Sequence, residues 1–122
     1  MTVTVYGTEA DRRELADLLA CLPDCSYRNV RVAGFSEYDD FIAGLGESPP
    51  ECVVITMDGA AGMEGVIAAR NTCGQVPVVW FSNDGGFGAQ SYRLGCAYFH
   101  EKPVSPRVLS AAIAKCVERR EK

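Results

Sequence analysis

The sequence lacks the features that mark several large protein classes. Its apolar runs fall far short of the roughly 20 residues that a membrane span requires, so no membrane-spanning segment is predicted. Basic residues are fewer than acidic ones: the sequence has 12 Lys and Arg and 16 Asp and Glu, which gives a net charge of −4. The basic cluster at residues 115–122 is interrupted by Glu118 and Glu121, which is typical of a solvated helix end. We therefore expect no nucleic-acid contacts in this chain.

Histidine is also scarce, since His100 is the only one, and a zinc site would need four ligands. Six cysteines are many for this length, but the N-terminal residues show no secretory signal, which favours a cytoplasmic location with reduced thiols. Four cysteines lie in or beside apolar runs, where a thiol behaves as a small hydrophobe: Cys52, Cys73, Cys96 and Cys116. Cys21 and Cys25 flank Pro23, and this spacing leaves open an incidental or redox-active pair.

What the sequence does contain is typical of one globular domain spanning residues 1–122. Hydrophobic residues make up 48% and charged residues 23%, and a chain of 122 residues can bury a core without cross-links. Short apolar runs alternate with helical patterns. The predicted strands are residues 3–6, 27–33, 52–55, 78–81 and 96–100. The predicted helices are residues 8–22, 36–45, 64–72, a weak helix ending at 94–95, and 105–117.

This alternation predicts an α/β fold, a three-layer sandwich in which five helices cover both faces of a five-stranded parallel sheet. The runs at residues 52–55 and 78–81 are continuously apolar, as strands buried on both faces are. Ligand sites in such folds lie beyond the carboxyl ends of the strands. The segments at those ends are Tyr6-Gly7-Thr8, Thr56-Met57-Asp58, Ser82-Asn83-Asp84 and Glu101-Lys102-Pro103.

Four segments carry a family resemblance: Lys102-Pro103 after an apolar strand, Pro77 to Ser82, Gly62-Met63-Glu64-Gly65, and residues 81–104 with Tyr92, Gly95 and Phe99. In this order, they resemble the receiver domain of two-component response regulators, a CheY-like domain, over residues 3–117. The last segment is most similar to receivers of LytTR (AgrA-like) transcription factors. The resemblance implies the flavodoxin-like strand order 2-1-3-4-5 and a role in a phosphorelay and in transcription regulation. It also fits a domain excised from a longer regulator, with residues 118–122 as the start of a linker.

The departures from the receiver pattern decide the expected chemistry. The resemblance places Tyr6 and Gly7 where receivers have two magnesium-binding acids, and Thr56 at the position of the phosphoacceptor Asp. Ser82 and Lys102 match the remaining pocket residues. Magnesium requires oxygen ligands, and phosphoryl transfer requires the metal's charge. We therefore predict an atypical, non-enzymatic pseudo-receiver without metal or cofactor.

Two alternatives remain open. Asp58 lies two residues past Thr56 and could serve as a relocated phosphoacceptor. Tyr6-Gly7-Thr8 also resembles the start of a flavodoxin phosphate loop, which would make the chain a cofactor binder, although the acids Glu9 and Asp11 would repel a phosphate. Phe99 matches the aromatic residue that switches rotamer in receivers, or is a half-buried edge aromatic.

The expected partners are proteins: a histidine kinase, an output domain or a second copy of the chain. The resemblance implies contact through the face formed by the fourth helix, the fifth strand and the fifth helix. That face would carry Tyr92, Tyr98 or Phe99, and the exposed side of residues 107–117, including Arg107 and Lys115.

Overall fold

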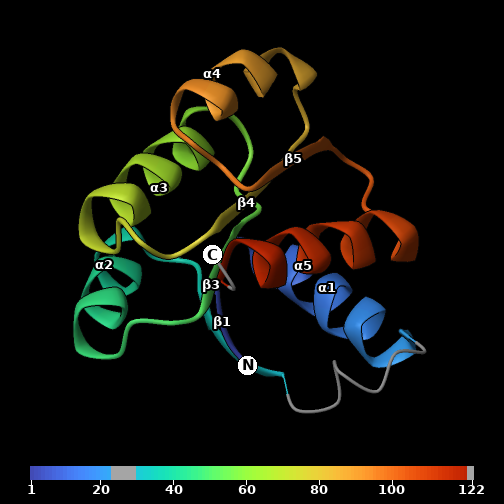
Figure 1. Ribbon diagram of the computed structural model, residues 1–122, viewed down its shortest axis with the longest axis horizontal. Coiled ribbons are helices and arrows are strands. Elements are labelled where there is room, and N and C mark those ends of the chain that lie inside the picture. Colours follow the sequence, from blue (N-terminus) through green and yellow to red (C-terminus); the bar gives the residue numbers. More distant parts are fainter. Residues whose placement is uncertain (23–29, 121–122) are drawn as a thin grey trace.

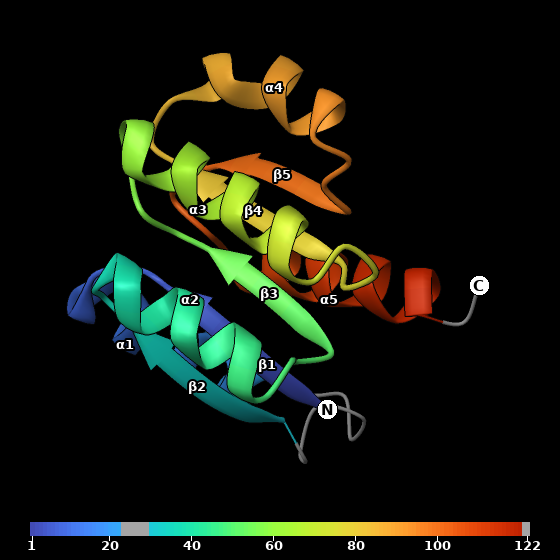
Figure 2. The same ribbon diagram turned by 90° about the vertical axis from the view of Figure 1, so that its left-hand side faces the viewer.

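Five parallel strands form one sheet at the centre of the molecule, and Figures 1 and 2 show the helices on its two sides. The computed structural model describes residues 1–22 and 30–120. The strands are β1 (Thr2–Tyr6), β2 (Arg31–Phe35), β3 (Cys52–Ile55), β4 (Val78–Ser82) and β5 (Tyr98–Glu101). Their order is β2-β1-β3-β4-β5, and every neighbouring pair is parallel. The predicted fold class and strand order are confirmed.

Five α-helices cover the sheet. Helices α1 (Glu9–Cys21) and α5 (Pro106–Arg120) pack on one face, and α2 (Tyr38–Glu47) and α3 (Gly59–Thr72) pack on the other. A 3₁₀ turn, η2 (Gly85–Phe87), leads into the short α4 (Gly88–Arg93), which packs beside β5. In Figure 1, α1 and α5 lie side by side, blue and red, on the side of the sheet away from α2 and α3.

The sheet separates two apolar cores because successive side chains of a strand point to opposite faces. The core under α1 and α5 contains Val3, Val5, Leu15, Cys52, Val54, Val79, Phe81, Leu109, Ala112, Ile113 and Cys116. The core under α2 and α3 contains Tyr6, Phe41, Leu45, Val53, Ile55, Val66, Ala68, Ala69, Cys73, Val78 and Trp80. Strands β3 and β4 contribute to both cores and are buried throughout, as predicted, whereas the edge strand β2 is largely exposed.

Two predicted helix starts are confirmed in detail. The hydroxyl of Thr8 accepts a hydrogen bond from the backbone N–H of Asp11 (3.2 Å), and that of Ser105 accepts one from Val108 (3.2 Å). Each is an N-cap contact that satisfies a backbone donor of the first turn. The second helix differs, because its N-cap is Glu37 without a side-chain hydrogen bond, rather than Ser36.

The prediction for the third helix was wrong at its N-terminal end. It starts at Gly59 rather than near residue 64, so the Gly- and Ala-rich segment expected to be a loop is its first turns. The glycines there allow close packing: a Cβ on Gly62 would lie 2.2 Å from the carbonyl oxygen of Met57, and a Cβ on Gly65 would lie 2.7 Å from the Tyr6 ring. Small residues thus mark a tight helix–sheet contact in this segment.

Two strand boundaries also differ. Strand β2 is paired from Arg31 to Phe35, two residues beyond the predicted end, and residues 27–29 of the prediction lie outside the described residues. Strand β5 starts at Tyr98 rather than at residue 96, because the backbone N–H of Cys96 bonds instead to the carbonyl of Ser91 (3.0 Å). The predicted Cys21–Cys25 pair includes a residue outside the described ranges.

Candidate functional site

The ammonium group of Lys102 is the centre of the site at the carboxyl ends of the strands. Lys102 follows β5, and its backbone N–H donates to the carbonyl of Ser82 (2.8 Å). Its Nζ donates to the carboxylates of Asp11 (2.9 Å) and Asp58 (2.8 Å) and to the backbone carbonyl of Thr56 (2.6 Å). An ammonium group has three donors, so these contacts use all three.

The two carboxylates reach Lys102 from different elements. Asp11 lies in the first turn of α1, and Asp58 is the N-cap residue of α3. Asp58 also accepts a longer hydrogen bond from the backbone N–H of Asn83 (3.3 Å), in the loop after β4. Side-chain exposure is 17% for Lys102, 26% for Asp11 and 48% for Asp58, so the network lies at the rim of the core. It connects α1, α3 and the loops after β4 and β5.

Thr56 and Gly7 fill the space beneath this network. Thr56 is buried, with 2% exposure, and its backbone N–H donates to the carbonyl of Tyr6 (2.9 Å). A Cβ added to Gly7 would lie 2.2 Å from Cγ2 of Thr56. A side chain at position 7 therefore does not fit beside Thr56 as it stands.

The cavity at this site is small. Thr56 and Lys102 line it together with Asp11, Glu14, Leu15 and Val104, and its volume is about 20 Å³. A cavity of that size holds about one water molecule. Within residues 1–22 and 30–120, no group of three or more His, Cys, Asp or Glu side chains is arranged to hold a metal ion.

Tyr6 does not line this site, which corrects its assignment to the pocket. Its ring stacks on Phe41 with a centroid distance of 4.6 Å and belongs to the core under α2 and α3. Burial raises the pKa of the Tyr6 phenol, and the negative charge of Glu64 raises it further. Tyr6 therefore supports the strand end from the opposite face of the sheet.

Ser82 is at the predicted strand end and is fully buried. Its Oγ accepts a hydrogen bond from the backbone N–H of Asp84 (3.1 Å). Asp84 in turn accepts one from Gly86 (2.8 Å), and Glu101 accepts one from Gly85 (2.9 Å). The Ser82 hydroxyl thus takes part in holding the loop between β4 and α4.

The alternation of β5 separates the two candidate aromatic residues of the contact face. The Phe99 ring packs edge-on against Trp80 at 5.4 Å, on the side of α4. Tyr98 packs against the core under α1 and α5. Its ring stacks with that of His100, and the two ring centroids are 6.4 Å apart. The ring centroid of Trp80 also lies 5.2 Å from that of Phe87, so the partly buried Phe99 belongs to an aromatic cluster.

Arg119 links α5 to the segment between α4 and β5. Its guanidinium group donates to the carbonyls of Gly95 and Cys96, each at 3.2 Å, and so joins α5 to the turn before β5. The side chain of Tyr92, in α4, is 87% exposed. Arg107 and Lys115 are also exposed, and Nζ of Lys115 lies 3.7 Å from Oε2 of Glu118.

No family model matches the sequence, and no curated protein does either. Solved structures do match. The chain has a TM-score of 0.78 and 17% identity with a response regulator receiver domain protein from Clostridium thermocellum, covering 98% of this chain and 96% of the other. For a LuxR family DNA-binding response regulator from Silicibacter pomeroyi, the TM-score is 0.76 and the identity 20%, covering 97% and 92% of the two chains.

A third similar structure is NtrX from Brucella abortus in complex with ADP, with a TM-score of 0.76, 19% identity and 98% of this chain covered. This chain spans about a quarter, 26%, of that NtrX chain. Together, these similarities show that the chain has the receiver-domain fold of two-component response regulators. None of the described helices is both long and apolar enough to span a membrane.

The sequence placed Thr56 and Asp58 in a segment at the strand ends, as it did Lys102, and both residues provide acceptors for its ammonium group. It did not place Asp11 beside Lys102, because Asp11 was considered only as an acid that would repel a phosphate. The signal was present: Asp11 lies three residues after the N-cap Thr8, and the first turn of α1 starts at the same sheet edge as Lys102. Ser82 is at the predicted edge, whereas Tyr6 faces away from it.

Proposed function

We propose that this chain is a pseudo-receiver domain of a two-component response regulator, which signals through protein contacts without phosphorylation and without catalysis. The observation that carries the proposal is the saturated Lys102 ammonium, with all three donors used by groups of the chain itself. The resemblance to receivers implies that this lysine meets the transferred phosphoryl group. In this chain, a phosphoryl group would have to displace an ion pair.

The residues around Lys102 support the same proposal. The resemblance places a phosphoacceptor Asp where this chain has Thr56, which is buried and carries no carboxylate. An acid at position 7 would collide with Cγ2 of Thr56. The carboxylates of Asp11 and Asp58 already have Lys102 as their cation, so a magnesium ion would have to lose water and compete with an internal charge.

A relocated acceptor at Asp58 is the second candidate function. The supporting observation is its exposure of 48%, the highest in the network, together with its contact with Lys102 at 2.8 Å. A phosphodonor in solution could reach this carboxylate more readily than the buried Thr56. The flavodoxin-like alternative has less support, because the cavity of about 20 Å³ is far smaller than a flavin.

Mass spectrometry separates the two candidates. The protein is incubated with acetyl phosphate and magnesium, and its intact mass is followed beside a receiver that retains its acceptor and metal-binding acids. We expect no added phosphoryl group. A phosphoryl group that is added to the wild type and lost in Asp58→Asn would replace the pseudo-receiver proposal with the relocated acceptor.

The proposed contact surface is the face of α4, β5 and α5. Its partner is an output domain, a histidine kinase or a second copy of the chain in the cytoplasm. The exposure of Tyr92 and the basic residues Arg107 and Lys115 support this surface, because aromatic and charged side chains together favour and orient protein contacts. The similarity to a DNA-binding response regulator supports transcription regulation as the output.

A further inference from the structure

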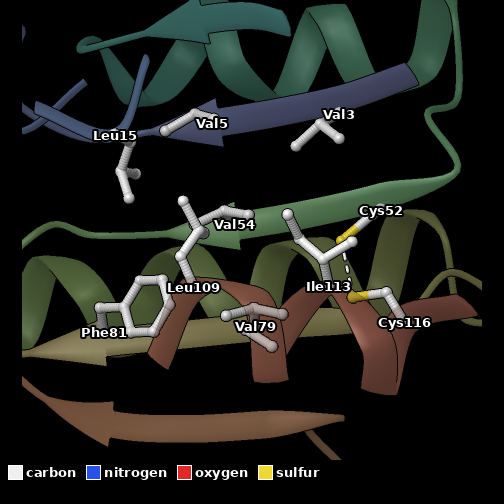
Figure 3. Packing of buried hydrophobic residues seen from close by; sticks show 11 residues of the cluster. Val3, Val5, Leu15, Cys52, Val54, Val79, Phe81, Leu109, Ile113 and Cys116 are labelled. Atoms are coloured by element: carbon white, nitrogen blue, oxygen red, sulfur yellow. Dashed lines mark hydrogen bonds between the residues drawn. The ribbon is translucent and has the colours of Figure 1, made fainter. Parts of the chain in front are cut away.

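Two cysteines that are distant in the sequence meet in the core under α1 and α5. Cys52 is the first residue of β3, and Cys116 lies near the end of α5. Their Sγ atoms are 2.8 Å apart and share a hydrogen bond in which either can be the donor. Figure 3 shows the two side chains pointing toward one another beside Ile113.

The surroundings of this pair are apolar. Both residues are buried, with exposures of 2% for Cys52 and 0% for Cys116, in a cluster of aliphatic side chains and Phe81. The hydrogen bond with Cys52 lowers the pKa of Cys116, burial opposes this effect, and the positive charge of Arg119 adds to it. Because the thiolate is the reactive form of a cysteine, this hydrogen bond favours reaction at the pair, and we take Cys116 as the attacking thiol.

We propose that Cys52 and Cys116 form a redox-sensitive pair, in which a peroxide converts the two thiols into a disulfide that joins β3 to α5. The inference rests on the juxtaposition of the two sulfur atoms across the sheet–helix interface. It is independent of whether the domain can be phosphorylated.

The chemistry balances with hydrogen peroxide as the oxidant. The Cys116 thiolate attacks one peroxide oxygen, the O–O bond breaks, and the departing hydroxide takes a proton to become water. The resulting sulfenic acid is attacked by the sulfur of Cys52, the S–S bond forms, and the S–O bond breaks. The second hydroxide leaves as water with the proton of Cys52. The two thiols lose two electrons in total, and the peroxide gains them.

Access to the buried pair requires local opening. Cys116 lies in the C-terminal part of α5, and the residues that follow it, Val117, Glu118 and Arg119, are exposed. Helix ends open more readily than central strands, so a fraying turn of α5 is the expected path for the oxidant. Once formed, the disulfide would hold α5, one side of the proposed contact face, against the sheet.

Cys73 and Cys96 are weaker candidates for the same reaction. Burial raises the pKa of Cys73, and it raises that of Cys96 to about 11. The Cys73 thiol has the carbonyl of Leu45 as its hydrogen-bond acceptor, at 3.9 Å, instead of a second thiol. Among residues 1–22 and 30–120, the thiol–thiol hydrogen bond is the one between Cys52 and Cys116.

Peptide mapping tests the inference on the native protein. The chain is treated with hydrogen peroxide, the remaining thiols are blocked with N-ethylmaleimide, and the protein is unfolded and digested without a reductant. We expect one peptide cross-linked between Cys52 and Cys116, a loss of two titratable thiols, and recovery of both thiols with dithiothreitol.

The variant Cys116→Ala should lose the cross-link, whereas the control Cys73→Ala should keep it, since Cys73 is buried in the other core. If Cys116→Ala does not fold, the peptide mapping of the wild-type protein decides the question by itself. A native protein that keeps all its thiols under peroxide, or whose thiol loss maps to Cys21 and Cys25, would overturn the proposal. Neither result bears on the acetyl phosphate experiment.

Discussion

At the residue scale, the ammonium group of Lys102 is the centre of the polar network at the carboxyl ends of the strands. Its ammonium holds two carboxylates and one carbonyl oxygen together, which are the kinds of ligand that a hard divalent cation takes. The lysine thus supplies the positive charge to which both carboxylates are paired.

We predict that Lys102→Met lowers the free energy of unfolding by about 2 kcal/mol. Removing one partner of a fully buried ion pair costs ~3–5 kcal/mol, and the loss is smaller here because solvent partly screens this network. The loss arises because Asp11 and Asp58 are left as unpaired neighbouring charges. Urea denaturation measures it. The control Lys115→Met removes an ammonium 3.7 Å from Glu118 on the exposed side of α5 and should cost less than about 0.5 kcal/mol. Equal losses for the two variants would contradict the prediction.

A second prediction at this scale concerns Tyr6 in alkaline solution. Burial, followed by the charge of Glu64, raises the pKa of its phenol in the folded state above 10.0. The folded state favours the neutral phenol of Tyr6. The stability that this preference contributes is therefore complete below pH 10.0 and is lost as the pH rises through the folded-state pKa. Denaturation at neutral pH and above pH 10.0 should show a smaller alkaline loss of stability for Tyr6→Phe than for the wild type. The exposed Tyr92→Phe serves as the control and should behave like the wild type.

At the scale of elements, the ends of β1 and β3 are fitted to one another. Thr56 follows β3 and Gly7 follows β1, and Cγ2 of Thr56 occupies the place where a side chain at position 7 would begin. Two of the three residues that depart from the receiver pattern are thus spatially coupled. A change at one of them alters what the other can accommodate.

We predict that Gly7→Ala destabilises the fold by about 1–3 kcal/mol, the usual cost of overpacking a core. Thr56→Ser removes Cγ2, so adding it to Gly7→Ala should recover about 1 kcal/mol as a favourable coupling. A double-mutant cycle in guanidinium chloride measures this. Gly46→Ala is the matched control, because a Cβ there would meet nothing within 4 Å. If the free-energy changes of the two substitutions simply add, position 7 and Cγ2 of Thr56 are not in tight contact.

The sequence predicted the elements well where hydrophobic pattern and capping agreed. The buried strands β3 and β4 and the caps at Thr8 and Ser105 are in this class. It failed at the start of α3, because glycines that are needed for close packing have the same local composition as a loop.

The candidate site was predictable to the extent that topology determines it. Parallel strands bring their carboxyl ends to one edge, and Lys102 contacts the backbone carbonyls of Thr56 and Ser82 there. The contact between Lys102 and Asp11 was not predictable in this way, since it depends on where the first turn of α1 lies relative to β5. The orientation of Tyr6 depends on which face of the sheet its side chain takes, and a one-residue change of register reverses that face.

At the scale of the whole molecule, one face differs from the rest. Figure 1 shows α4 apart from the two pairs of helices that cover the sheet, beside β5. Arg119 joins α5 to the turn that precedes β5, and both α4 and α5 pack against β5. A partner that binds there would contact a surface already assembled in the free chain.

We predict that this surface mediates self-association or partner binding without a phosphodonor. Arg107→Glu or Lys115→Glu should weaken the complex by about tenfold, because charges at the rim of an interface steer and orient contact. Sedimentation velocity over a range of concentrations measures self-association, and Arg31→Glu on the exposed edge strand β2 is the matched charge reversal. A monomer that dimerises only after treatment with acetyl phosphate would contradict this prediction.

The saturated Lys102 has a consequence for how information could pass through such a protein. A receiver with an open pocket reports the activity of its kinase, and its output rises and falls within the lifetime of a phosphoryl bond. Under the proposed function, the network of Lys102, Asp11 and Asp58 leaves no such adjustable input. The strength of the signal would then depend on the number of copies of the protein in the cell, which synthesis and degradation determine. The response would change on the time scale of protein turnover rather than on that of phosphorylation.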